Sequence, residues 1–171
     1  MKVLADSLVG QENVPVELYQ EFMQDIAAEI DRESKIITDL LTLVKLDKKA
    51  SNMNIELVNI NELLDMILKR LHPIAAKRNI ELILEGFRPV DAEIDETKLS
   101  LAISNLVENA IKYNKDEGWV KVSLNADHKY FYVTVTDSGL GIPEESIDHI
   151  FERFYRVDKS HSTEIEGTGL G

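Results

Sequence analysis

The sequence predicts an α+β protein in which a helical hairpin precedes an α/β sandwich. One long segment, residues 15–49, has helical periodicity and no residue that would interrupt a helix. After residue 54, short apolar segments typical of strands alternate with helical patterns, as in a sandwich with helices on one face of a sheet. We therefore expect the hairpin in residues 1–50 and the sandwich in residues 55–171, joined by a polar connector at residues 51–54.

Composition narrows the possible functions. Of the 171 residues, 44% are hydrophobic and 29% are charged, which is ordinary for a globular protein. The net charge of −12 argues against a nucleic-acid partner, because phosphate contacts need a basic surface. Cysteine is absent, which excludes disulfides and thiolate metal sites and fits a reducing cytoplasm. The sequence has neither a signal peptide nor an apolar run of the roughly 18 residues that span a bilayer.

The first long segment predicts one helix beginning at Pro15. At about 1.5 Å per residue its length is roughly 45–50 Å. Such a helix either lies on its own domain or forms the arm of a coiled coil or bundle, and its length favours the second interpretation. Residues 1–9 resemble the tail of a preceding helix, which Gly10 ends. The apolar residues that recur at steps of three, four or seven are Leu18, Phe22, Ile26, Ile30, Ile37, Leu40 and Val44.

The second part predicts the elements of the sandwich in chain order. Asn61 is expected to cap the first helix, which runs to about Lys77, and Asp95 to cap the second. A hairpin is expected to turn at residues 125–128. The predicted strands are residues 55–58, 80–85, 90–94, 119–124 and 130–136.

The helix after Asp95 carries two asparagines and a lysine on one face. At roughly 100° per residue, Asn105, Asn109 and Lys112 fall within about 60° of one another. Asparagine is unfavourable inside a helix, so the pair either marks a site or lies on a merely solvated face. Amide oxygens are suitable Mg²⁺ ligands, and the lysine can place a cation at phosphates. The apolar stripe expected to face the core comprises Leu99, Ile103, Leu106 and Ala110.

The segment Asp137-Ser138-Gly139-Leu140-Gly141 follows the last predicted strand. Glycines permit a close approach of the backbone to a ligand. A carboxylate at the strand end can accept a hydrogen bond from the amino group of adenine, whereas guanine presents a carbonyl there. The competing interpretation is an ordinary turn.

Two segments near the end of the chain are also candidates. The glycines of residues 167–171 can present backbone N–H groups to phosphates, or they form a linker. Residues 150–156 form an aromatic and basic segment, in which Arg153 or Arg156 can add charge at the phosphates. We expect an amphipathic helix here that packs its aromatic side chains in the core. In the functional interpretation, these side chains also hinge a mobile lid over residues 158–166.

Together, residues 105–113, 137–143, 150–156 and 167–171 resemble the N, G1, F and G2 boxes of sensor histidine kinases, in the family's order. These kinases share a Bergerat-type ATP-binding fold with the wider GHKL superfamily, which includes DNA gyrase and the MutL repair proteins. Residues 29–47 resemble the second helix of the family's dimerisation and phosphoacceptor domain. The resemblance implies that residues 1–50 are part of that domain and that the catalytic sandwich is truncated after its second glycine box.

The resemblance also implies roles for individual residues. Asn109 would bind Mg²⁺ with help from Asn105, and Lys112 would contact phosphate. Tyr113 would pack beside the nucleotide, and Asp137 would recognise adenine. The role of Glu108 stays open between a site residue and a surface carboxylate. The loop glycines would be Gly139 and Gly141 beside adenine, and Gly167, Thr168, Gly169 and Gly171 at the phosphates.

The phosphoacceptor motif of the family, a histidine followed by an acidic residue, is absent. His72, His128, His149 and His161 lack that context, so we expect the acceptor upstream and this chain alone to be inactive. The resemblance implies a parent enzyme that uses Mg²⁺ and ATP to phosphorylate a histidine and then a response-regulator aspartate. That parent would be a homodimer, and any membrane attachment would lie upstream of this cytoplasmic part.

Three further interpretations remain open at this point. The chain resembles other ATPases of the superfamily, in which nucleotide closure works as a gate. A protein-serine kinase of the anti-sigma type and a non-catalytic dimerisation module are the remaining two.

Overall fold

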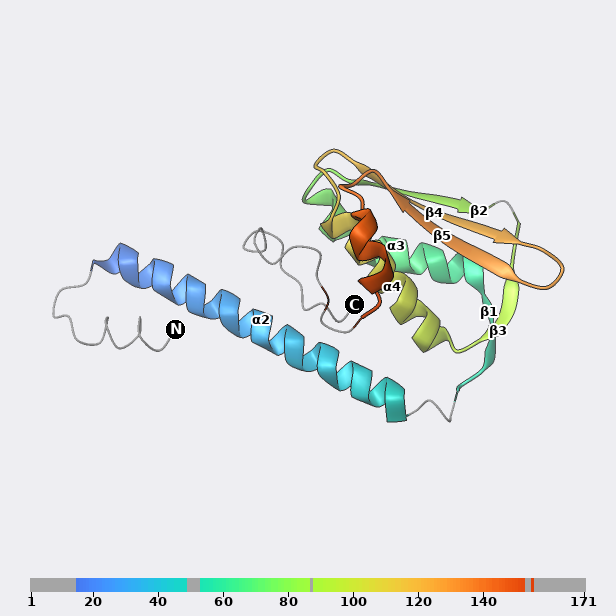
Figure 1. Cartoon of the computed structure of the whole chain (residues 1–171), viewed down its shortest axis with the longest axis horizontal. Coiled ribbons are helices and arrows are strands. Elements are labelled where there is room, and N and C mark those ends of the chain that lie inside the picture. The colour runs from blue at the N-terminus through green and yellow to red at the C-terminus, as the bar shows by residue number, and fades with distance from the viewer. Residues whose placement is uncertain (1–14, 49–52, 87, 153–154, 156–171) are drawn as a thin grey trace. The chain divides into compact units, whose positions relative to one another are not determined.

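The computed structural model describes residues 15–48, 53–86, 88–152 and 155 (Figure 1). The chain divides into two compact units, Met1–Asp47 and Lys48–Gly171. The helix tail expected in residues 1–9 lies outside the described residues, as do residues 51–52 of the connector. Within the described ranges, no helix carries an apolar stretch long enough to cross a membrane.

The first unit contains a single described helix, α2 (Val16–Lys48), of 33 residues. It begins where the sequence predicts, because the Pro15 carbonyl accepts hydrogen bonds from Leu18 N and Tyr19 N at 3.1 and 3.2 Å. Of the expected apolar stripe, Phe22 and Ile26 are half-buried, whereas the side chain of Val44 lies outside the described part. The stripe residues Leu18, Ile30, Ile37 and Leu40 are exposed.

The second unit contains two small sheets. Strands β1 (Glu56–Asn59) and β3 (Asp91–Ile94) pair antiparallel. In the other sheet the order is β2-β4-β5, with β2 (Glu81–Gly86) parallel to β4 (Trp119–Ala126). Strand β5 (Phe131–Asp137) then pairs antiparallel with β4. Each predicted strand is therefore confirmed to within two residues at either end.

The turn between β4 and β5 differs from the prediction. Strand β4 continues through Ala126, so the turn lies at residues 127–130 rather than 125–128. The Asp127 carboxylate explains the shift, because its Oδ1 accepts hydrogen bonds from Lys129 N and Tyr130 N at 2.8 and 2.7 Å. The backbone N–H of Asp127 also donates to Tyr130 O at 2.9 Å, and this hydrogen bond closes the hairpin.

Helix α3 (Ile60–Ala76) begins two residues earlier than expected, and the predicted cap is wrong. The N-cap is Asn59, whose Oδ1 accepts a hydrogen bond from Glu62 N at 3.0 Å. Asn61 lies within the helix, and its side chain joins the β2–β3 connection instead. Its Oδ1 accepts from Val90 N at 2.9 Å and its Nδ2 donates to Arg88 O at 3.1 Å.

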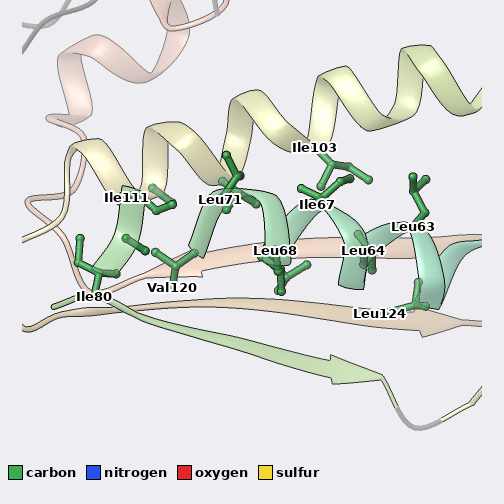
Figure 2. Close-up of a cluster of buried hydrophobic side chains, with 14 of the residues drawn as sticks. Leu63, Leu64, Ile67, Leu68, Leu71, Ile80, Ile103, Ile111, Val120 and Leu124 are labelled. Carbon is green, nitrogen blue, oxygen red and sulfur yellow. The ribbon is translucent and has the colours of Figure 1, made fainter. Parts of the chain in front are cut away.

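The core lies between the three-stranded sheet and the helices α3 and α4 (Glu96–Lys112), which cover one face of that sheet (Figures 1 and 2). Apolar side chains of α3 point toward the sheet and toward α4, as Figure 2 shows for Leu68 and Leu71. Alternate side chains of β4 point into the same core from the sheet side. The largest fully buried side chains, whose burial stabilises the fold, are Ile60, Leu64, Ile67, Ile111, Val107, Val120 and Val122.

The predicted apolar stripe of α4 is wrong for one residue, Leu106. Leu106 is 51% exposed, whereas Val107 is fully buried. The stripe facing the core is therefore centred directly opposite Asn105, between Ile103, Val107, Ala110 and Ile111. Leu106 falls just beyond its edge, because the expected stripe was rotated from the true one by part of a turn.

Candidate functional site

The asparagine face of α4 points away from the core. Asp95 is the N-cap as predicted, with its Oδ1 accepting a hydrogen bond from Lys98 N at 3.0 Å. Asn109 is exposed, and Asn105 and Lys112 are half-buried. Within the described part of the chain, neither asparagine side chain makes a hydrogen bond. Their oxygens are thus not committed to the fold, as a ligand site requires.

Tyr113 ends α4 beside this face. It is the C-cap residue, and its N–H donates to the carbonyl of Asn109 at 2.9 Å. Tyr113 is 41% exposed, and the Lys112 Nζ atom lies 5.0 Å from the centroid of its ring. This contact has the geometry of a cation–π interaction. A flat aromatic surface and a cation therefore lie together at the end of α4.

The Asp137 loop is joined directly to this helix end. Asp137 is the last residue of β5, and its Oδ1 accepts a hydrogen bond from Gly139 N at 2.8 Å. The next amide, Leu140 N, donates to the Tyr113 carbonyl at 3.2 Å. Both segments that the sequence singles out for nucleotide binding are thus held in one place.

Glycine is required at the two loop positions for different structural reasons. A Cβ atom on Gly139 would lie 2.5 Å from Tyr113 O and 2.8 Å from Asp137 Oδ1, so a side chain would force the loop away from α4. Gly141 has a φ of +72° and nothing within 4 Å of such an atom, so its requirement is conformational. Only the first of them is needed for close packing.

A buried hydrogen-bonded residue next to Tyr113, Asn114, was not predicted from the sequence. Asn114 is 3% exposed, and its Nδ2 donates to Trp119 O at 3.0 Å. Its Oδ1 accepts from Lys115 N and from the Ser138 hydroxyl, each at 3.0 Å. Gly118 permits this approach, because a Cβ there would lie 2.3 Å from Asn114 Oδ1. The signals in the sequence were Asn114, directly after the first motif, and Ser138, inside the second.

Arg78 is a second residue that the sequence did not indicate. It lies between α3 and β2, and its guanidinium donates to three carbonyls at the end of α4. The acceptors are Ile111 O, Lys112 O and Asn114 O. No local motif marks such a residue, since its partners lie more than thirty positions away.

The remaining predicted site residues lie outside the described part of the chain. They are Arg153, Arg156, Gly167, Thr168, Gly169 and Gly171.

The segment before them departs from the expected core helix. A 3₁₀ helix spans Glu144–His149, and Phe151 is 90% exposed rather than packed in the core. Tyr155 is half-buried and donates its hydroxyl proton to Ser146 Oγ at 3.0 Å.

Two open cavities in the described part of the chain lie away from the predicted site. One, of about 300 Å³, lies at the start of α3 beside Asn61 and Arg88. The other, of about 400 Å³, lies between α3 and β2 beside His72 and Leu82. The candidate site remains the α4 face and the Asp137 loop, because the residues with suitable chemistry gather there. Among the described residues, no three histidine, aspartate or glutamate side chains cluster as a metal site.

This fold and this joined helix and loop define a class of nucleotide-binding domain. The profile of the family "Histidine kinase-, DNA gyrase B-, and HSP90-like ATPase" matches residues 94–171, from the end of β3 through the last glycine motif. The family assigns ATP as the nucleotide of this domain.

Known proteins narrow the class further. The sensor histidine kinase WalK of Bacillus subtilis is 33% identical over 153 residues, which cover 88% of this chain and 25% of that protein. The catalytic domain of the histidine kinase ThkA is 30% identical with a TM-score of 0.62, covering 70% of this chain and 75% of that one. ThkA in complex with the response regulator TrrA is 25% identical with a TM-score of 0.68, covering 85% and 43%.

The chain belongs to the sensor histidine kinase family, within these ATPases. It spans about a quarter of the length of the curated relatives it matches.

Proposed function

We propose that this chain is the Mg·ATP-binding core of a protein-histidine kinase. In the whole protein, the γ-phosphoryl group of ATP would pass to a histidine and then to an aspartate of a response regulator. Support comes from the family, and from the ThkA structure, in which that kinase is in complex with a response regulator. Little covalent chemistry is required of the protein in such a transfer, so positioning and charge compensation dominate.

Adenine recognition is assigned to the Asp137 loop. Asp137 Oδ1 holds Gly139 N, and the second carboxylate oxygen is the acceptor for the exocyclic amino group. Gly139 and Gly141 shape the loop around the base, and the Tyr113 ring packs beside the nucleotide. The 41% exposure of Tyr113 supports this role, because a core tyrosine would bury its ring.

Metal binding is assigned to Asn109, with Asn105 assisting. The donor set fits Mg²⁺, because amide oxygens are hard ligands and this cation usually binds few protein atoms beside phosphates and waters. The exposure of Asn109 on the solvent side of α4 leaves room for those other ligands. When bound, Mg²⁺ would neutralise charge on the phosphates.

The phosphates themselves are assigned to Lys112 and to residues beyond the described part. Those residues are Arg153 and the glycine motif of Gly167, Thr168, Gly169 and Gly171, which lie inside the matched family range. Backbone N–H groups of such a motif suit phosphate oxygens. The acidic net charge of −12 makes these local cations important for ATP binding.

The first 50 residues are assigned to the dimerisation and phosphoacceptor domain, and residues 55–171 to the catalytic domain. Four apolar side chains of the α2 stripe are exposed in the single chain, which supports a homodimer that covers them. The partner of the whole protein would be a response-regulator receiver domain. We place this part of the protein in the cytoplasm, with membrane anchoring through other segments.

One observation carries the nucleotide-binding proposal: the hydrogen bond from Leu140 N to Tyr113 O, which joins the adenine-side loop to the metal-side helix. Calorimetric titration of the chain with ATP and GTP, each with and without Mg²⁺, tests it. We expect ATP to bind more tightly than GTP, and Mg²⁺ to strengthen ATP binding. Equal affinity for the two nucleotides, or none for either, would overturn the proposal.

A further inference from the structure

Arg78 joins the end of α4 to the connection between α3 and β2, and it lies far in sequence from every residue assigned to nucleotide or metal. Its backbone is held independently of its side chain. Arg78 N donates to Ala75 O at 3.1 Å, and Arg78 O accepts from Glu117 N at 3.2 Å. The side chain is 37% exposed, so its head is partly shielded from water. A substitution there changes the guanidinium contacts while these two backbone contacts stay available.

The guanidinium makes an unusually complete set of contacts. Its Nη1 donates to Ile111 O at 3.0 Å and to Lys112 O at 2.9 Å. Its Nη2 donates to Asn114 O at 2.6 Å. The fourth contact, from Nε to Asp116 Oδ1 at 2.9 Å, is an ion pair in which the carboxylate is 77% exposed. Three of the four contacts are therefore with the backbone of α4 and the residues just after it.

The carbonyls of Ile111 and Lys112 belong to the last turn of α4, whose carbonyls have no N–H partner from a following turn of the helix. The same end of a helix carries a partial negative charge, which a cation stabilises. The planar fork of arginine places two nitrogens on three carbonyl oxygens, which the single ammonium of a lysine does not reproduce. Arg78 thus supplies a cap for α4 that comes from a distant part of the chain.

The carbonyl between the Arg78 contacts belongs to Tyr113, and it accepts the hydrogen bond from Leu140 N. Arg78 therefore holds the carbonyls of Lys112 and Asn114, on either side of the one that anchors the Asp137 loop. Without it, the last turn of α4 is free to fray, as helix ends do when their carbonyls lack partners. Fraying would move Asn109 and Lys112 relative to Asp137.

We propose that Arg78 is a positioning residue that sets the spacing between the Asn109 and Lys112 face of α4 and the Asp137 loop. The proposal rests on the nucleotide-binding function given above. ATP is long enough to use both parts at once, whereas adenosine uses only the Asp137 side. A positioning role therefore affects ATP more than adenosine.

The test compares Arg78→Gln and Arg78→Lys with the matched control Asp116→Asn. The control removes the exposed ion pair and leaves the three carbonyl contacts in place. Each folded variant is titrated calorimetrically with Mg·ATP and with adenosine. We expect Arg78→Gln to weaken ATP binding by about 10- to 100-fold. In Arg78→Gln, adenosine affinity is expected to change by less than about threefold. In Asp116→Asn, the affinities for ATP and for adenosine are both expected to change by less than about threefold.

Arg78→Lys is expected to fall between wild type and Arg78→Gln in its ATP affinity, because it keeps the charge and loses the fork. Equal losses for ATP and adenosine, or no loss of either, would show that Arg78 only stabilises the fold.

A nucleotide-free measurement separates this proposal from the proposed function. Hydrogen exchange of the Leu140 amide should be faster in Arg78→Gln than in wild type or Asp116→Asn, because the Tyr113 carbonyl is no longer fixed. Unchanged Leu140 exchange would overturn the positioning role. If the wild-type chain bound no ATP, the proposed function would fail, and Leu140 exchange would still decide the role of Arg78.

Discussion

The backbone amide of Leu140 donates a hydrogen bond to the carbonyl of Tyr113 at 3.2 Å, and this contact joins two motifs separated by a hairpin. Tyr113 ends α4, and Leu140 lies in the loop that follows β5. The buried Asn114 and the Ser138 hydroxyl form a second connection, 3.0 Å long, beside it. The arrangement of the site therefore depends on contacts that the folded sheet creates.

Gly139→Ala should break this connection. The added Cβ would lie 2.5 Å from Tyr113 O, so the loop must move, and overpacking of this kind costs about 1–3 kcal/mol. We expect a lower free energy of unfolding in urea and loss of hydrogen-exchange protection at the Leu140 amide. In Gly141→Ala the new methyl meets nothing within 4 Å, and the cost comes only from the φ of +72°, so Leu140 should lose less protection than in Gly139→Ala. Protection that persists in Gly139→Ala would contradict the close packing described here.

Asp137→Asn should alter base preference while preserving the loop. The asparagine oxygen can still accept the 2.8 Å hydrogen bond from Gly139 N. The other carboxylate oxygen becomes an amide NH₂, which repels the amino group of adenine and matches the carbonyl of guanine. We expect ATP affinity to fall by about 10-fold or more, and the ratio of ATP to GTP affinity to fall with it. Competition binding with the two nucleotides measures that ratio, and an unchanged ratio would remove Asp137 from base recognition.

The orientation of α4 can be checked by two truncations on the same helix. Ile103 is 3% exposed, and Ile103→Ala should lower the free energy of unfolding by about 2–5 kcal/mol. Leu106 is 51% exposed, and Leu106→Ala should cost less than about 1 kcal/mol. Chemical denaturation followed by the fluorescence of Trp119, the single tryptophan, measures both. Similar losses would mean that the sequence-predicted stripe, with Leu106 inside, was right after all.

The hairpin turn should lose stability in acid. The N–H groups of Lys129 and Tyr130 and the hydroxyl of Tyr132 hold the pKa of the Asp127 carboxyl below its usual range. Because the folded pKa is lowered, the stabilising contribution is complete above the unfolded pKa of about 3.9 and disappears as pH falls through the folded value. Urea unfolding of wild type and Asp127→Asn should therefore differ most above about pH 5 and converge in stronger acid. A difference that is constant with pH would contradict this account.

Much of the fold was predictable, because local patterns dominate its elements. Alternating apolar residues predict β4 and β5, and Asp95 predicts the start of α4. Errors arose where two local signals compete. Asn59 and Asn61 both resemble helix caps, and only the partners of Asn61 in the β2–β3 connection decide between them.

The candidate site was predictable only in part, for a physical reason. The shared face of Asn105 and Asn109 follows from helical geometry, which is local. That these residues bind metal, and that Asp137 binds adenine, stay predictions. The contacts of Arg78 and Asn114 depend on hydrogen bonds between segments far apart in sequence, so no spacing rule indicates them.

The central claim is that Asn109 binds the metal of a Mg·ATP complex, and Asn109→Ala tests it most directly. Asn109 is exposed in the interior of α4, so alanine should raise helix stability by about 0.5 kcal/mol through its higher propensity. Thr97→Ala, an exposed change on the same helix, is the control. We would measure ATP affinity with and without Mg²⁺ for wild type and both variants. The account predicts that the strengthening by Mg²⁺ disappears only in Asn109→Ala; a strengthening that survives there unchanged would contradict it.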